Sequence, residues 1–126
     1  MIINLLYVAL GGACGASFRF IITSLSKFFF PYFPLGTLLV NISGCFVIGL
    51  LANYIYSKEI SDEFVRYFVI VGMLGSFTTF SAFSIETMEL LQNNKLYFSI
   101  LYIFLSVFLC LIAAYLGFYI KKLSIW

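Results

Sequence analysis

The sequence predicts an all-α membrane protein, with four transmembrane helices in one domain that covers residues 1–126. Of these residues, 63% are hydrophobic and only 10% are charged, whereas soluble domains usually carry about 25% charged residues. Four stretches are mostly apolar and long enough for a spanning helix, which needs about 20 residues. Short connections separate these stretches. The bilayer is therefore the solvent that suits this composition.

Charge and cysteine content exclude several classes of function. A net charge of +2 gives no reason to expect a nucleic-acid partner, and the absence of His excludes an imidazole base or a His-ligated metal. Cys14, Cys45 and Cys110 are far apart in apolar stretches and form no CxxC pair. We interpret them as small packing residues rather than as metal ligands or disulfide partners.

The first predicted helix covers residues 2–22. It resembles a signal peptide in position, but no Lys or Arg precedes its apolar run, so we predict a retained helix. Gly11 and Gly15 are spaced as GxxxG, which favours close helix packing in lipid. Arg19 lies near the end of this helix. Its guanidinium is either an anchor at the membrane surface or part of an ion pathway, and the sequence leaves both interpretations open.

The second predicted helix covers residues 36–56, directly after Pro34. Thr37, Asn41 and Gly44 share one face of it. An amide at the depth of Asn41 needs hydrogen-bond partners. It either holds two helices together or lines a pore.

The third predicted helix covers residues 67–91 and carries the strongest signal. Two glycines, five hydroxyl residues and three Phe residues crowd residues 72–84, which is poor material for a regular lipid-facing helix. We therefore predict a break, which would free backbone groups to bind ions. Phe80 and Phe83 share a face, and packing or an ion path explains them equally well. Glu86 and Glu89 lie near the end of the helix, where solvation among the lipid headgroups is favoured over a bond to a neighbouring helix.

The fourth predicted helix covers residues 98–120, with residues 57–63 and 92–95 as the remaining loops. Ser99, Tyr102 and Ser106 form a weak polar stripe along it, which fits a polar contact between helices. Basic residues are balanced between the two sides of the membrane, four against three. One side holds Lys58, Arg66, Lys121 and Lys122, and the other holds Arg19, Lys27 and Lys95. The positive-inside rule therefore hardly favours one orientation, and we expect insertion in both.

Three motifs in this order resemble the Fluc family of fluoride channels, also called CrcB. They are Gly-Gly-x-x-Gly-Ala-x-x-Arg at residues 11–19 and Gly-Thr-Leu-x-Val-Asn-x-x-Gly at residues 36–44. The third is Gly-x-x-Gly-x-x-Thr-Thr-Phe-Ser-x-Phe-Ser-x-Glu at residues 72–86. The resemblance covers essentially the whole chain.

The resemblance implies a fluoride-selective channel rather than an enzyme. It implies passive fluoride export across the cytoplasmic membrane, which lowers fluoride toxicity. The expected assembly is a dual-topology antiparallel homodimer with two pores, whose partners are fluoride and the lipid bilayer.

The resemblance also assigns residues to roles. The implied fluoride path consists of Asn41, Phe80, Ser81, Phe83 and Tyr102. The carbonyls of Gly75 and Thr78, from both subunits, are implied to hold a structural Na⁺ at the dimer interface. Arg19 matches the basic residue of the family's first helix, and Glu86 is a vestibule or structural residue. Ala82 stands where the family often has Thr, which removes one hydroxyl from the polar track.

Elementary physics agrees with a fluoride path. Asn41 and Ser81 can donate hydrogen bonds, and the positive edges of aromatic rings can face an anion. Two other functions remain as alternatives. A small multidrug-type exporter would need a membrane-embedded acid to couple protons, and the first helix has none. A non-transporting assembly subunit would not need the polar cluster of the third helix.

Overall fold

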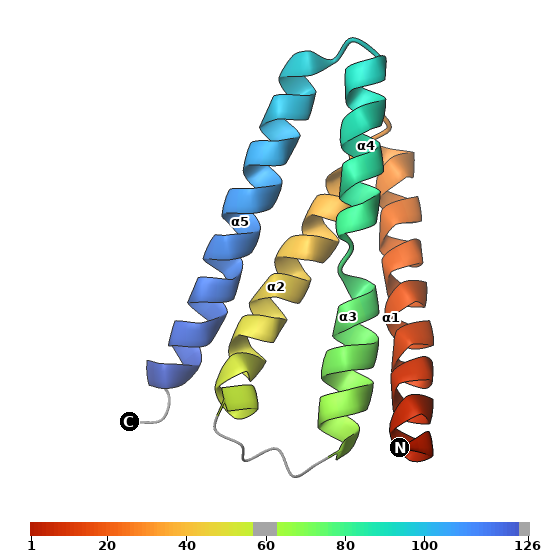
Figure 1. Cartoon of the computed structure of the whole chain (residues 1–126). Coiled ribbons are helices and arrows are strands. Elements are labelled where there is room, and N and C mark those ends of the chain that lie inside the picture. The colour runs from red at the N-terminus through yellow and green to blue at the C-terminus, as the bar shows by residue number, and fades with distance from the viewer. Residues whose placement is uncertain (57–62, 124–126) are drawn as a thin grey trace.

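The computed structural model describes residues 1–56 and 63–123, and these residues are almost entirely helical (Figure 1). Four helical stretches among them are long and apolar enough to cross a membrane, as the sequence predicts. The elements are α1 (Ile2–Phe29), α2 (Leu35–Tyr56), the π-helix η1 (Phe64–Leu74), α3 (Gly75–Phe77), α4 (Phe80–Gln92) and α5 (Leu96–Leu123).

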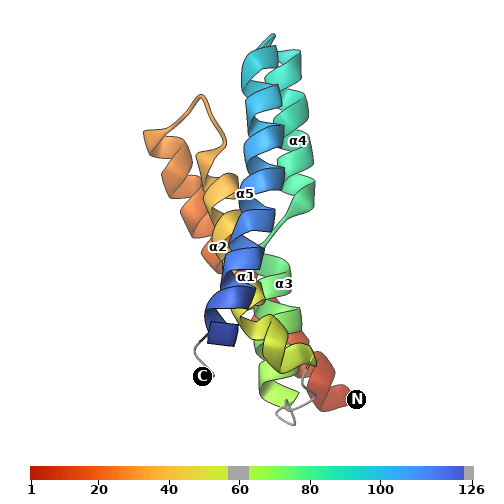
Figure 2. The same ribbon diagram turned by 90° about the vertical axis from the view of Figure 1, so that its left-hand side faces the viewer.

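Both ends of the chain lie at the same end of the bundle, because an even number of spans returns the chain to its starting side (Figure 1). The turn between α4 and α5 lies at the opposite end. Figure 2 shows α4 and α5 side by side there, while the connection between α1 and α2 leans away from them. Of the charges counted above, Lys58 and the side chains of Lys121 and Lys122 lie outside the described residues.

Three spans extend beyond their predicted bounds by two residues or more, and the second begins one residue early, at Leu35. The first continues to Phe29 rather than ending at residue 22, and the last covers Leu96–Leu123 rather than 98–120. Polar residues do not end α1, because their hydroxyls bond to its own backbone: Thr23 Oγ1 donates to the Arg19 carbonyl at 2.9 Å. The helix ends before Pro31, which disfavours helical geometry in Phe30. The third span begins at Phe64 rather than at residue 67.

Small residues bring α1 and η1 into backbone contact, as the GxxxG spacing predicts. A Cβ at Gly11 would collide with the Phe68 carbonyl, and a Cβ at Gly15 would collide with the Met73 carbonyl. Ser76 Oγ adds a hydrogen bond to the Gly12 carbonyl at 2.9 Å. Only residues without a side chain permit this approach, and it fixes the first half of the third span against α1.

Two extended residues, Thr78 and Thr79, separate α3 from α4 within the third span. Their φ and ψ angles are −75° and 151° at Thr78, and −152° and 117° at Thr79. Thr79 caps the new helix, because its hydroxyl accepts a hydrogen bond from the Ala82 N–H at 3.2 Å. The chain therefore leaves helical geometry in the middle of this span and resumes it at Phe80.

Helices α2 and α5 run in the same direction and face each other at four-residue steps. Just before α2, the Phe33 ring lies 6.4 Å from the Phe98 ring and 5.5 Å from the Tyr102 ring of α5. Toward the other end, a Cβ at Gly49 would collide with the Ala114 carbonyl. The positions between them at the same spacing are Thr37 opposite Tyr102, Asn41 opposite Ser106, and Cys45 opposite Cys110. We call this set of five pairs the α2–α5 ladder.

Candidate functional site

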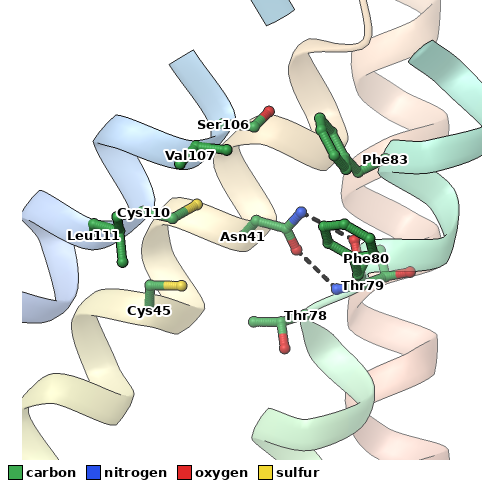
Figure 3. A pocket seen from close by; sticks show the side chains of 10 residues that line it. All are labelled: Asn41, Cys45, Thr78, Thr79, Phe80, Phe83, Ser106, Val107, Cys110 and Leu111. Carbon is green, nitrogen blue, oxygen red and sulfur yellow. Dashed lines mark hydrogen bonds between the residues drawn. The ribbon is translucent and has the colours of Figure 1, made fainter. Parts of the chain in front are cut away.

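A cavity of ≈ 320 Å³ lies between α2, α5 and the interrupted part of the third span (Figure 3). It is formed by the middle of the α2–α5 ladder on one side and by the residues around the interruption on the other. Its lining is Asn41, Cys45, Thr78, Thr79, Phe80, Phe83, Ser106, Val107, Cys110 and Leu111.

The amide of Asn41 pairs with the backbone of Thr79 in both directions. Its Nδ2 donates to the Thr79 carbonyl at 3.0 Å, and its Oδ1 accepts from the Thr79 N–H at 2.8 Å (Figure 3). The amide thus replaces helical partners that the interruption removes. Asn41 does hold two spans together, and it also lines the cavity. Its nitrogen has a second hydrogen, which this pair does not use.

The interruption diverts two amides that would otherwise serve helical carbonyls. In a continuous helix the Gly75 carbonyl would accept from the N–H of Thr79, four residues later. That N–H donates to Asn41 instead. The Thr78 carbonyl would accept from the Ala82 N–H, which donates to the Thr79 hydroxyl. Gly75 and Thr78 also line one further cavity of ≈ 170 Å³, together with Gly44, Cys45, Ile48, Ile70 and Leu74.

The two Phe residues are brought together but differ in burial. The rings of Phe80 and Phe83 lie 5.2 Å apart, and both line the larger cavity. Phe83 is buried and also packs against Tyr102, with 5.2 Å between ring centroids. Phe80 is 76% exposed within the single chain. One ring is therefore part of the core, and the other lies on the surface of the single chain.

Ser106 contributes a hydroxyl to the same cavity. It is buried, and among the described residues its Oγ is the one buried side-chain polar atom without a hydrogen-bond partner. Leaving such a group unpaired costs about 1–3 kcal/mol. A ligand in the cavity that accepts a hydrogen bond would remove this cost.

Glu86 is bonded to two neighbouring helices, contrary to the favoured expectation of headgroup solvation. Its Oε1 accepts from the Thr37 hydroxyl at 2.8 Å, and its Oε2 accepts from the Tyr102 hydroxyl at 2.8 Å. Both donors are almost completely buried. The carboxylate therefore cross-links α4 to one pair of the α2–α5 ladder, while Glu89 is exposed.

Besides Gly75 and Glu86, three residues of the predicted site lie away from the larger cavity. Tyr102 is fully buried, with Phe83 between its ring and Phe80. Ser81 is exposed, and its Oγ lies 3.1 Å from the Thr79 Oγ1. Arg19 is half-buried on α1 and lines neither cavity. The structure thus brings Asn41, Phe80 and Phe83 together, and it places Ser81 and Tyr102 next to this group.

Sequence reasoning did not single out Thr79 and assigned Ser106 only to a polar stripe. The stripe does face inward, since Ser99, Tyr102 and Ser106 are all buried. Thr79 could have been found as a helix N-cap, because a Thr before a helical run favours that position. The cavity role of Ser106 depends on the packing of α2 against α5, for which the sequence carries no signal.

The larger cavity is mostly apolar and offers a few neutral hydrogen-bond donors. Its lining contains amide and hydroxyl donors and aromatic rings, and it contains no acidic or basic side chain. Neutral donors can replace the water around an anion without holding it as strongly as a fixed positive charge would. This balance suits an ion that passes through rather than one that stays.

Comparison with known proteins agrees with this chemistry. The profile of the family described as CrcB-like protein, Camphor Resistance (CrcB), matches residues 6–118. A protein of Flavobacterium psychrophilum is 41% identical over 120 residues, with 94% of this chain and 97% of the relative covered. One from Campylobacter jejuni is 49% identical over 124 residues, with 97% and 100% covered. A third, from Francisella tularensis, is 42% identical over 120 residues, with 92% of each chain covered. All three are named fluoride-specific ion channel FluC.

Proposed function

The chain belongs to the CrcB-like protein family, and on that premise we propose that it is a fluoride-selective ion channel. It is a multi-pass protein of the cell membrane and a channel rather than an enzyme. Through it fluoride leaves the cytoplasm passively, which lowers fluoride toxicity. The observation that carries the proposal is the reciprocal bond between Asn41 and Thr79, which holds an amide donor beside two Phe rings.

Selectivity arises from the cost of removing water from the ion. An anion in a low-dielectric medium loses tens of kcal/mol of hydration unless other donors replace the water. The second N–H of Asn41, the Ser106 hydroxyl and the edges of the Phe rings are the replacements in the cavity. A narrow arrangement of a few fixed donors suits small fluoride better than larger chloride.

The path continues from the cavity past the Phe pair. Phe80 and Phe83 belong to it, followed by Ser81 and Tyr102, which lie next to them. Ala82 lacks the hydroxyl that the family often has there, so Ser81 and the Thr79 hydroxyl bonded to it supply the polar groups at this depth. Arg19 lies on α1 outside both cavities, and its role in the proposal is to attract anions to the protein.

The functional unit is an antiparallel homodimer with dual topology. Its support is the exposure of Phe80, which leaves half of the ring pair uncovered in the single chain. The exposed Phe80 ring by itself gives no closed path through the single chain. Tagging the C-terminus and scoring its side in cells tests the topology. A single orientation throughout would contradict it, and adding two Lys residues to one side should force one orientation.

A Na⁺ at the dimer centre is the structural ion of the assembly. The carbonyls of Gly75 and Thr78 fit it, because the amides that would serve them in a continuous helix bond elsewhere. Hard cations prefer such oxygen ligands. When bound, the ion supplies positive potential near the two paths.

Fluoride efflux from liposomes carrying the purified protein tests the function. Initial efflux is measured with a fluoride electrode, once the voltage across the liposome membrane that opposes anion efflux has been removed. Chloride efflux serves as the control. We expect rapid fluoride loss and little chloride loss. Equal rates for the two anions would contradict selectivity, and proton-coupled drug uptake without fluoride flux would favour an exporter instead.

A further inference from the structure

Two cysteines that are far apart in the sequence meet in the α2–α5 ladder. Cys45 and Cys110 form the step directly after Asn41 and Ser106, and both line the larger cavity. Figure 3 shows their sulfur atoms on adjacent helices, pointing to the same side, toward the cavity. The third cysteine, Cys14, lies on the exposed face of α1 and outside this cavity.

The spacing of the two helices supports a lasting contact between these thiols. One step further along the ladder, a Cβ at Gly49 would collide with the Ala114 carbonyl. A Cβ at Gly117 would likewise collide with the Phe46 carbonyl. Because the backbones touch there, the two cysteines cannot separate without breaking the packing of α2 against α5.

Paired thiols in a mostly apolar setting prefer soft metal ions. Thiolate sulfur binds soft cations far better than it binds hard ones such as Na⁺ or Mg²⁺. The cavity residues around the pair contribute hydroxyl, amide and apolar groups, and none of them is a carboxylate that would favour a hard ion. Two ligands suffice for a d¹⁰ ion that accepts linear coordination.

We propose that Cys45 and Cys110 of one chain together bind one soft, thiophilic metal ion, of the class represented by Hg²⁺, at the base of the cavity. Both S–H bonds break, two protons leave to solvent, and two S–Hg bonds form, so that the product RS–Hg–SR is neutral. No electron is transferred. The bound ion fills space beside Asn41 and therefore blocks fluoride, a consequence that rests on the proposed channel function.

Metal retention tests the site independently of ion flux. Replacing Cys14 with Ala leaves Cys45 and Cys110 as the only thiols. The purified Cys14→Ala protein receives one equivalent of Hg²⁺ and is then washed with a monothiol. A second ligand on the same chain raises retention by about 100-fold over a single thiol. Cys14→Ala should therefore keep its mercury, whereas Cys14→Ala/Cys45→Ala and Cys14→Ala/Cys110→Ala should lose it. Ser in place of Ala provides a second set of variants if either Ala variant folds poorly.

Other outcomes would overturn the site. Equal loss of mercury from the two-thiol protein and from the single-thiol variants would show that the thiols do not act together. A dimer linked by mercury on a denaturing gel without reductant would place the two sulfurs on different chains.

Fluoride efflux then tests the blocking effect. Cys14→Ala should lose most of its flux with Hg²⁺ and regain it with a dithiol chelator. The flux of the variant that lacks all three cysteines, compared with its own metal-free rate, should not change when Hg²⁺ is added. Absence of flux in metal-free protein would contradict the channel function and leave the retention result unaffected. Full flux with mercury retained would overturn the blocking effect alone.

Discussion

The side chain of Asn41 and the backbone of Thr79 act as a matched pair across the interruption of the third span. Each donates one hydrogen bond to the other, over 3.0 Å and 2.8 Å. The amide thereby supplies the hydrogen-bond partners that the next helical turn would supply to the backbone of a continuous helix. The same residue also lines the cavity, so a structural bond and the proposed ion contact depend on one side chain.

Asn41→Leu should therefore lose both flux and stability. It leaves the Thr79 N–H and carbonyl without their partner, and each such buried group costs about 1–3 kcal/mol. Initial fluoride efflux at equal reconstituted protein and thermal unfolding in detergent are the two measurements. Asn41→Asp is the matched variant: it keeps an acceptor for the Thr79 N–H but places negative charge at the path. Asn41→Asp should be the more stable of the two, yet conduct poorly. Wild-type fluoride flux in either variant would show that Asn41 does not belong to the path.

Substitutions of Phe80 and Phe83 should differ in how much they lower the unfolding free energy. Phe83 packs on both Phe80 and Tyr102, whereas Phe80 is mostly exposed in the single chain. Aromatic pairs contribute about 0.5–1.5 kcal/mol beyond their buried area. Phe83→Ile should thus lower the unfolding free energy of the detergent-solubilised protein by about 1 kcal/mol more than Phe80→Ile. Both substitutions delete a ring edge, so both should reduce fluoride efflux severely. Wild-type efflux in both variants would mean that the path lies elsewhere.

Tyr102→Phe should weaken the junction of α4 and α5. Its hydroxyl donates to the Glu86 carboxylate at 2.8 Å and is completely buried. A hydrogen bond to a charged group contributes about 1.5–3 kcal/mol, and we expect that loss in thermal or denaturant unfolding. Tyr97→Phe is the control, because Tyr97 lies on the same helix and is 75% exposed. An equal effect of the two substitutions would show that the Glu86 contact adds nothing.

Glycines of the bundle should differ sharply in their tolerance of a methyl group. A Cβ at Gly117 would collide with the Phe46 carbonyl and lie 2.9 Å from the Leu50 nitrogen, so α2 and α5 would have to separate. Gly117→Ala should cost about 1–3 kcal/mol, as overpacking of a filled interior typically does. Gly12→Ala meets nothing within 4 Å in the chain and should leave the unfolding temperature of the monomer unchanged or slightly raised. The reverse order would contradict the packing of α2 against α5.

Gly75→Ala should keep the proposed Na⁺. The nearest atom to an added Cβ is the Ile70 carbonyl oxygen at 3.8 Å, an ordinary contact, so the local backbone is preserved. Because backbone oxygens are the ligands, the ion should remain, and ion-replacement density or anomalous scattering between the two subunits measures it. Thr79→Pro removes the N–H that bonds to Asn41, shifts the interruption and should lose the ion. Absence of density in the unaltered protein would refute the site.

The sequence by itself determined the class of the protein and the composition of its site. Apolar runs of spanning length fix four membrane helices, because a bilayer admits little else. The crowding of Gly, Ser, Thr and Phe in residues 72–84 marked the polar part of the third span, and three motifs indicated the family. All of these are local patterns, which a single stretch of chain displays.

Tertiary structure alone decided which residues meet. The bond from Asn41 to the Thr79 backbone, the two hydroxyls on Glu86 and the meeting of Cys45 with Cys110 all join separate spans. Sequence reasoning favoured solvation for Glu86 and did not bring Cys45 and Cys110 together, because composition does not encode the register between two helices. That register follows from backbone contacts such as Gly49 with Ala114, and it depends on the shapes of both surfaces together.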